Sequence, residues 1–243
     1  MEKYIYQELY ELENKHWWFV SKKNIVIGFI KKYLHVSKEN KILDVGCGSG
    51  LMLNDLTGFG TVCGMDSSDE AIKFSKLVFN GEVKEGYIPG RIPYPEKHFD
   101  LILALDVLEH LEDDVKSIDD IKAHLNDNGI CIITVPAYMF LWSYHDKVHE
   151  HKRRYTSKEL YQKLRAAGFN ILKLSYYNTL LFLPILLLRT VNKIFKRESG
   201  SDAKMPNRYL NYMLQKVFTF ECSLLKFFNM GFGVSIIAVV KNQ

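Results

Sequence analysis

Residues 41–50 read Lys-Ile-Leu-Asp-Val-Gly-Cys-Gly-Ser-Gly, and this stretch decides the fold. A short apolar run, Ile42 and Leu43, leads to Asp44, after which glycines alternate with small residues. The pattern predicts a buried strand that leaves its sheet through a tight turn, with a helix beginning near Leu51. Glycine suits such a turn because it adopts positive φ without strain and lets a ligand lie against bare backbone. In open α/β sheets, nucleotide-like ligands bind at turns of this kind.

The rest of the chain alternates apolar runs with amphipathic segments, and its 243 residues suit one large α/β domain. Further strands are expected at 61–66, 99–105, 130–135, 170–177 and 234–241. Further helices are expected at 22–34, 69–79, 115–125 (stopped by Asn128-Gly129), 156–168 and 209–228, while 83–95 is expected to be a loop. Short connections between alternating strands and helices predict right-handed βαβ units in one mostly parallel sheet.

Two nucleotide ligands compete for the glycine turn. A dinucleotide fingerprint, G-x-G-x-x-G, would need glycine at position 51, where this chain has Leu51. Asp44 would also face a pyrophosphate unfavourably, whereas it suits the cationic α-ammonium of S-adenosylmethionine. Asp66 ends the next expected strand, where a carboxylate can accept from both ribose hydroxyls. The alternative for Asp66 is a solvated turn residue that caps the following helix.

Several motifs in order resemble the class I S-adenosylmethionine-dependent methyltransferases. The resemblance rests on Asp44-Val-Gly-Cys-Gly-Ser-Gly50, Asp66 and Phe99-Asp-Leu-Ile102. Three more stretches, followed near the end by Gly231-Phe-Gly-Val-Ser235, are similar to a bacterial branch (type 11/12-like) with an N-terminal HWWF motif. They are His16-Trp-Trp-Phe19, Asp106-Val-Leu-Glu-His110, and Leu141-Trp-Ser-Tyr-His-Asp146 with His151-Lys-Arg-Arg-Tyr155. The resemblance covers nearly the whole chain.

The resemblance implies a fold and a cofactor. The implied fold is a doubly wound, Rossmann-like, mostly parallel seven-stranded sheet with an antiparallel last strand. The implied methyl donor is S-adenosylmethionine, with S-adenosylhomocysteine as product. Asp44 would bind its ammonium group, Asp66 its ribose, and Leu105 and Asp106 would lie beside the methionine tail. The full set of expected cofactor-binding residues is Asp44, Gly46, Cys47, Gly48, Gly50, Asp66, Ser67, Tyr87, Ile88, Leu105 and Asp106.

One departure from the resemblance concerns the adenine. Many relatives place an acid after the third strand to accept from the adenine amino group. This chain instead has Tyr87-Ile88 after Gly86. We therefore expect main chain and apolar contact to hold the adenine.

The methyl acceptor should meet residues that follow Pro136, at the end of the fifth strand. A general base is needed only where the acceptor nucleophile is protonated at neutral pH. The expected catalytic residues are His145 first, then Asp146 and His110. The expected substrate-binding residues are Trp18, Trp142, His151, Arg153, Arg154 and Tyr155, with Arg153 or Arg154 suited to an anionic acceptor.

Blander interpretations of the same residues remain open. The segment after Pro136 can be a polar loop whose charges pair locally, and His110 can simply help to start a helix. Imidazole and carboxylate are ordinary metal ligands. The spacing of His145, Asp146, His149 and His151 matches no closed zinc pattern, so no metal is predicted.

Two segments flank or interrupt the expected sheet. Residues 1–34 are expected to form a helical lid over the ligand, or a helix that covers the edge of the core. In its helix 22–34 the basic residues Lys22, Lys23, Lys31 and Lys32 are expected to face outward. Residues 179–230 form a hydrophobic helical insert, with a linker expected at 198–207.

The apolar run 179–188 is followed by Arg189, Lys193, Lys196 and Arg197, and it is shorter than the roughly 20 residues that span a bilayer. A cap on the core, a dimer surface and a membrane-interface segment are the alternatives.

The predicted function is methyl transfer to oxygen or nitrogen of a small-molecule, lipid-linked or glycan acceptor. The alternative is a non-catalytic S-adenosylmethionine-binding or regulatory protein. A net charge of +4 is too weak to argue for nucleic acid. No separate basic recognition domain is apparent, and Val135-Pro-Ala137 stands in place of an Asn/Asp-Pro-Pro-Tyr motif, so nucleic acid is not an expected substrate. Four scattered cysteines and the absence of an N-terminal signal sequence predict a cytoplasmic protein. In the membrane-interface alternative, residues 179–197 make peripheral contact with the inner face of the membrane. The oligomeric state stays open.

Overall fold

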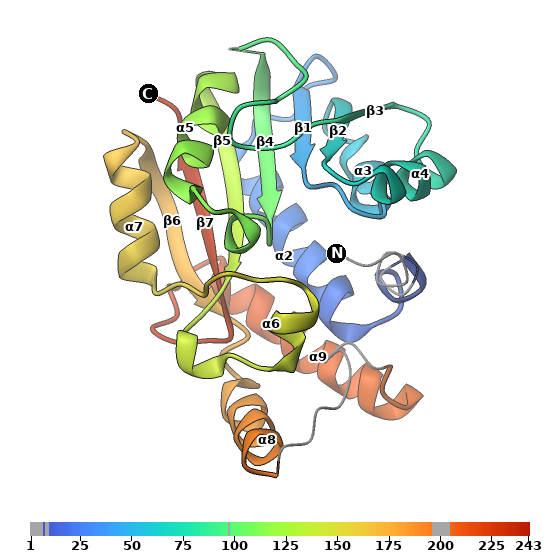
Figure 1. Ribbon diagram of the computed structural model, residues 1–243, viewed down its shortest axis with the longest axis vertical. Coiled ribbons are helices and arrows are strands. Elements are labelled where there is room, and N and C mark those ends of the chain that lie inside the picture. The colour runs from blue at the N-terminus through green and yellow to red at the C-terminus, as the bar shows by residue number, and fades with distance from the viewer. Residues whose placement is uncertain (1–6, 8–9, 97, 196–204) are drawn as a thin grey trace.

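A seven-stranded sheet runs through the molecule in the order β3-β2-β1-β4-β5-β7-β6 (Figure 1). The computed structural model describes residues 7, 10–96, 98–195 and 205–243. The strands are β1 (Lys41–Val45), β2 (Thr61–Asp66), β3 (Glu82–Glu85), β4 (Phe99–Leu105), β5 (Leu125–Pro136), β6 (Asn170–Tyr177) and β7 (Ser235–Lys241). Neighbouring strands pair in parallel, except that β7 pairs antiparallel with both β5 and β6. The expected doubly wound, Rossmann-like sheet with an antiparallel last strand is confirmed.

Helices cover both faces of this sheet. The named helices of the described residues are α2 (Trp17–Tyr33), α3 (Leu51–Leu56), α4 (Asp69–Val78), α5 (Asp114–His124), α6 (Tyr144–Val148), α7 (Ser157–Ala166), α8 (Phe182–Ile194) and α9 (Arg208–Leu225), with 3-10 turns η1 (Leu108–His110) and η2 (Met139–Leu141). The buried residues of α5 and α7 join one core cluster, and those of α2, α3 and α9 join the other. Side chains alternate between the two faces of the sheet along strand β4. Leu101 and Leu103 therefore join one cluster, while Ile102 and Ala104 join the other. A parallel strand covered on both faces is therefore apolar throughout.

Two local predictions were wrong. Residues 83–95 were expected to be a loop, but Glu82–Glu85 forms β3, which pairs with β2 at the edge of the sheet. A short edge strand with charged residues gives little apolar signal. The helix expected at 115–125 lies at Asp114–His124, but Asn128-Gly129 is not its stop, because β5 already begins at Leu125. Asn128 adopts a positive φ of 68° within that strand, so the turn-forming pair marks an irregular strand rather than a helix end.

Two helices have N-caps that their sequences explain. Thr156 caps α7 with the reciprocal box that Glu159 completes. Gly50 occupies the N-cap of α3 with a φ of 78°, as the glycine turn predicted. A Cβ at Gly50 would come within 2.6 Å of the Ser75 backbone, so glycine is required both for conformation and for close approach to α4.

Segments distant in sequence meet beyond the carboxyl ends of the parallel strands, where α6, α8 and the first described residues gather (Figure 1). Helix α2 packs along α9, and the ring of Trp18 lies 5.6 Å from that of Phe218. Asn211 of α9 joins the two: its side chain accepts from the Trp17 amide (2.9 Å) and donates to the Lys15 carbonyl (2.9 Å).

Helix α8 exposes apolar side chains and buries none of its residues fully. None of the described helices has the length and apolarity required to cross a membrane. The predicted linker at 198–207, except for residues 205–207, lies outside the described residues, as do Lys196 and Arg197.

Candidate active site

A cavity of about 1270 Å³ opens beyond the ends of β1, β2 and β4. Its walls come from the glycine turn, the first described residues, α2, the loop after β4, α6 and the loop that follows it, and α8 and α9. Eight of the expected cofactor-binding residues line it: Asp44, Gly46, Cys47, Gly48, Asp66, Ser67, Leu105 and Asp106. Parallel strands bring their carboxyl ends to one edge, which is why acids distant in sequence meet here.

The glycine turn presents bare backbone to this cavity. The amides of Gly46 and Cys47 both donate to the Met65 carbonyl, at 2.8 and 3.0 Å, which folds the turn against β2. Gly46 has a φ of 70°, and a Cβ there would lie 2.8 Å from Val107. Gly48 has a φ of 54°, and a Cβ there would meet nothing within 4 Å. The open space over Gly48 is available to a ligand that lies against the main chain.

Asp66 organises the turn from the neighbouring strand. Its carboxylate accepts from the amides of Gly48 and Ser68, each at 3.0 Å and each on a different oxygen. Burial raises the pKa of Asp66, although the amide hydrogen bonds oppose that shift. Each carboxylate oxygen keeps a further lone pair, so Asp66 can still accept two hydroxyl hydrogen bonds from the cavity.

Asp44 lies deeper, at the base of the cavity. It is buried, and its carboxylate accepts no hydrogen bond from the residues that the structure describes. Burial raises the pKa of Asp44 to about 7, and the charge of Lys22 acts against this rise. A buried carboxylate without a hydrogen bond is costly, and a cationic ligand group would relieve that cost.

Asp106 is the third acid that lines the cavity, together with Asp44 and Asp66. Lys22 Nζ donates to its Oδ2 at 2.8 Å and Thr134 Oγ1 to its Oδ1 at 2.8 Å. Burial alone would raise the pKa of Asp106, but the charge and hydrogen bond of Lys22 lower it. The expectation that Lys22 faces outward was wrong, because its side chain is only 17% exposed and lines the cavity.

The residues before α2 and those of its first turn form an adjoining wall. Ser49 of the glycine turn donates to the Glu13 carboxylate, and Glu13 lines the cavity together with the aromatic run that begins at His16. Trp18 belongs to that wall and packs its ring 6.0 Å from Tyr177. These contacts place an aromatic surface in the same cavity as the glycine turn. The lid assignment itself stays a prediction.

Five residues expected on the acceptor side share the cavity wall: Trp18, His110, His145, His151 and Arg154. The ring of His145 lies 4.0 Å from that of His149, and its Nδ1 has no hydrogen-bond partner among the described residues. Burial, reinforced by the neighbouring histidines, holds the pKa of His145 well below its usual range. The imidazole of His145 is therefore neutral at neutral pH, and its low pKa makes it a weak base.

Asp146 is buried behind this wall rather than in it. Its two oxygens accept from Arg154 Nε and Nη2 at 2.8 and 2.9 Å, and Oδ1 lies 2.8 Å from His151 Nδ1. Burial opposes ionisation, but the His151 hydrogen bond and Arg154 together lower the pKa of Asp146. Asp146 therefore positions His151 and Arg154 and does not itself line the cavity.

The remaining acceptor-side candidates lie away from the cavity lining. Trp142 is half-buried beside η2. Arg153 pairs with Asp114 at 3.3 Å, and Tyr155 is buried with its hydroxyl donating to the same carboxylate at 2.7 Å. Local charge pairing, the blander interpretation of this loop, describes Arg153 and Tyr155 well.

Three expected cofactor-binding residues also lie outside the lining. Gly50 packs on α4, Ile88 is buried in the core, and Tyr87 is half exposed in a bridge to Arg91. The expected adenine contacts at Tyr87 and Ile88 are therefore not part of this cavity.

Some lining residues were missed by reasoning from sequence. Glu13, Lys22 and Glu109 all line the cavity, and Thr134 supports it by holding Asp106. Glu109 alone carried a signal, because it stands inside Asp106-Val-Leu-Glu-His110, the stretch quoted for the resemblance. An apolar wall was missed as well, formed from α8, α9 and the residue before α8 by Leu181, Pro184, Ile185, Leu188, Leu210 and Leu214.

Comparisons with known proteins agree with this geometry. The profile of a family described as methyltransferase domain matches residues 23–174. Ubiquinone biosynthesis O-methyltransferase from Pelagibacter ubique is 32% identical over 131 residues, which cover 49% of this chain and 54% of that protein. The chain thus spans about half the length of the curated relatives it matches.

Solved structures share the fold at low identity. An S-adenosylmethionine-dependent methyltransferase from Archaeoglobus fulgidus superposes with a TM-score of 0.54 at 18% identity, covering 90% of this chain and 94% of that one. Phosphoethanolamine N-methyltransferase 2 from Haemonchus contortus, solved with S-adenosylmethionine, gives 0.58 at 14% identity, covering 90% of this chain and 52% of that one.

Proposed function

The chain belongs to the methyltransferase-domain family, and on that premise we propose that it transfers a methyl group from S-adenosylmethionine to an oxygen of a small-molecule acceptor. The observation that carries this proposal is the wall that Asp44, Asp66 and Asp106 form around the open backbone of the glycine turn. Acids at three strand ends suit a ligand with a cationic tail and a ribose. They would repel a free phosphate.

The residues present fit S-adenosylmethionine. Asp44 would hold the α-ammonium, directly or through water, because it is a buried carboxylate to which no described residue donates a hydrogen bond. Asp66 would accept from the two ribose hydroxyls with its unused lone pairs, while its existing bonds keep the turn in place. The bare face of Gly48 would lie beneath the cofactor. These roles rest on the chemistry of the donor set.

The cofactor would supply an already activated methyl group, so the protein's tasks are alignment and exclusion of water. Trp18 and the neighbouring aromatic wall would shield the reacting atoms from solvent. Lys22 would hold Asp106 in position through the 2.8 Å ion pair. His145, neutral and turned to the cavity, would take the proton of an acceptor hydroxyl.

The acceptor we propose is a hydroxylated small molecule with an apolar tail. Relatives at 32% identity are named ubiquinone biosynthesis O-methyltransferases, which supports an oxygen nucleophile. Leucines, an isoleucine and a proline from α8, α9 and the residue before α8 line the far side of the cavity, where an alkyl or isoprenoid chain would be buried. The same apolar lining disfavours a glycan.

We place the source of such an acceptor at a lipid surface. The side of α8 away from the cavity exposes Leu183, Leu187 and Ile194 by 63, 65 and 70%. The cavity side of the same helix contributes Ile185 and Leu188. A helix that is apolar on both sides can lie in the membrane interface and pass a lipid-linked acceptor to the cavity. Peripheral contact at the inner face of the membrane, by a cytoplasmic protein, is the arrangement we propose.

Calorimetry with S-adenosylmethionine tests the cofactor, and a homologous series of alkylphenols tests the acceptor. S-adenosylhomocysteine release should increase with alkyl chain length until the chain fills the apolar wall. Binding without turnover of any phenol would favour the non-catalytic alternative. Absence of binding by the full chain would contradict the proposed function itself.

A further inference from the structure

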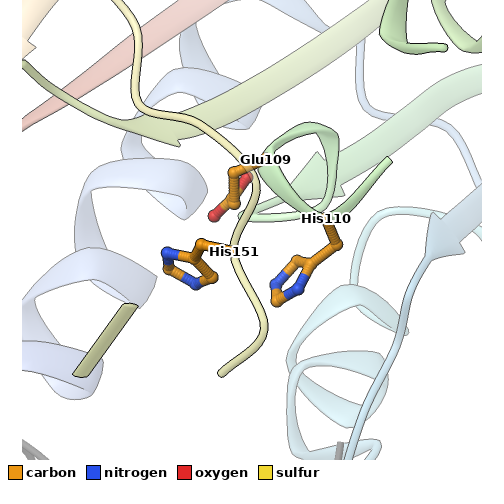
Figure 2. A group of neighbouring side chains, drawn as sticks. All are labelled: Glu109, His110 and His151. Atoms are coloured by element: carbon orange, nitrogen blue, oxygen red, sulfur yellow. The ribbon is translucent and has the colours of Figure 1, made fainter. Parts of the chain in front are cut away.

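Glu109, His110 and His151 converge on one point of the cavity wall (Figure 2). Each offers one ligand atom, and these atoms all lie within 4.8 Å of one another. Glu109 and His110 come from η1, directly after β4, and His151 comes from the loop after α6. Two segments distant in sequence are thus brought together by the sheet edge.

Glu109 is the member that ordinary protein contacts leave unexplained. The residue is fully buried, and neither carboxylate oxygen accepts a hydrogen bond from another described residue. The cations that act on it are Lys22 and Arg154, and each is bonded to a different carboxylate, Asp106 or Asp146. Buried carboxylates are normally hydrogen-bonded, paired or bound to a metal.

His151 is oriented in the manner typical of a metal ligand. Its Nδ1 lies 2.8 Å from Asp146 Oδ1, and Arg154 fixes that carboxylate with two further bonds. A carboxylate behind a histidine selects the tautomer and leaves Nε2 as the ligand atom. The ring of His110 meets that of His151 at 90° with centroids 4.7 Å apart.

We propose that Glu109, His110 and His151 bind a divalent first-row metal ion such as Mn²⁺, Co²⁺ or Zn²⁺. Two imidazoles and one carboxylate are a common ligand set for these ions and leave coordination positions open. Bonds of about 2.0–2.2 Å place ligand atoms roughly 3–3.5 Å apart, so the cluster contracts by about 1 Å on binding. No metal is predicted from the spacing of His145, Asp146 and His149 with His151, which matches no closed zinc pattern. The proposed site uses His151 with two residues of the adjacent turn η1, which the Lys152 amide contacts through the Glu109 carbonyl at 2.8 Å.

The consequence for chemistry rests on the proposed function. An open position on the ion would bind the acceptor hydroxyl and lower its pKa, and His145 would take the proton and pass it to solvent. The resulting oxygen anion would form a bond to the methyl carbon while the carbon–sulfur bond breaks, its electron pair staying on sulfur. The products would be a methyl ether, S-adenosylhomocysteine and one proton. The acceptor class is thus a phenol or other hydroxyl compound that can bind a metal.

Metal binding is measured on the full, untagged chain by titration with Co²⁺ alone, followed by its visible absorption and by calorimetry. We expect one equivalent in the wild type. Glu109→Gln and His151→Asn should each bind at least tenfold more weakly. His35→Ala, an exposed histidine outside the cluster, is the matched control and should bind like wild type. Circular dichroism establishes that each variant is folded, and if Glu109→Gln did not fold, His151→Asn would decide.

The two proposals fail separately. Wild type that binds S-adenosylmethionine but no Co²⁺, or Glu109→Gln that binds Co²⁺ as tightly as wild type, would overturn the metal site and leave the methyltransferase proposal intact. Wild type that binds Co²⁺ at this cluster but no S-adenosylmethionine would do the reverse.

Discussion

Lys22 Nζ lies 2.8 Å from Asp106 Oδ2, and this ion pair ties α2 to the loop that follows β4. The two residues are 84 positions apart in sequence. Lys22 also acts electrostatically on Asp44, Glu13 and Glu109, so one cation offsets several acids of the same cavity. The segment before the sheet is thus part of the site.

Replacing Lys22 by methionine should lower the free energy of unfolding by about 1–3 kcal/mol, because the pair is neither fully exposed nor fully buried. The cavity acids would lose their shared counter-charge. Urea denaturation measures the change. Lys31→Met, on an exposed position of the same helix, serves as the control and should leave stability unchanged. An equal loss in both variants would show that helix surface properties, and not the ion pair, are responsible.

Affinity for S-adenosylmethionine should rise with pH around neutrality. Burial raises the pKa of Asp44 to about 7, so the carboxylate is mostly protonated at pH 6 and mostly ionised at pH 7.5. Only the ionised form attracts an ammonium group. We expect roughly five- to tenfold tighter binding at pH 7.5 than at pH 6.0, measured by calorimetry.

The raised pKa of Asp44 also determines how the stability of the folded protein changes with pH. Because the folded pKa of Asp44 exceeds its unfolded value, the contribution of Asp44 to stability is present at low pH and is lost as pH rises through about 7. Asp44→Asn should bind the cofactor weakly and with little pH dependence. If the affinity of the wild type varied with pH as little as that of the variant, ammonium binding at this residue would be contradicted.

Removing the Asp66 carboxylate should weaken S-adenosylmethionine binding by more than tenfold. Asp66→Ala eliminates both ribose hydrogen bonds and the bonds to the Gly48 and Ser68 amides that shape the turn. Hydrogen bonds to a charged group contribute about 1.5–3 kcal/mol. Asp69→Ala, exposed at the start of α4, is the control. Unchanged affinity in Asp66→Ala would end the ribose assignment.

Helix α8 should bring the protein to lipid vesicles. Flotation with anionic liposomes should carry the wild type upward, and serine at Leu183, Leu187 and Ile194 together should abolish flotation. None of the three lines the cavity, so cofactor affinity should persist in the variant. Leu77→Ser removes a leucine that is 74% exposed on α4 and should float like wild type. Equal flotation of the triple variant would exclude α8 as the contact.

Local signals predicted the sheet well. Each of β1, β2 and β4 is a short apolar run that ends in or beside an acid, and burial on both faces leaves few other residue types available. The turn at Gly46–Gly50 needs residues that tolerate positive φ, which the sequence displays directly. Strand β3 escaped notice because Glu82–Glu85 has one neighbour and little to bury.

The site was harder to predict wherever a residue depends on packing between distant elements. The helical periodicity predicted that Lys22 faces solvent. A helical pattern cannot show that the polar side of α2 faces the cavity. Arg153 and Tyr155 carry suggestive chemistry, but Asp114 engages both. Adjacent residues separate for the same reason: Arg154 reaches the cavity while its neighbours turn away.

The bonds of Asn211 have a kinetic consequence. Its side chain holds the main chain at both Lys15 and Trp17, so the first described residues and α9 are fastened at one point. Trp17 and Leu210, which lie next to that point, both line the cavity, and Leu210 belongs to its apolar wall. A displacement that admits a long acceptor would therefore also loosen the cover over the cofactor. Acceptor exchange and cofactor exchange would share a single gate, and turnover would follow its opening rate.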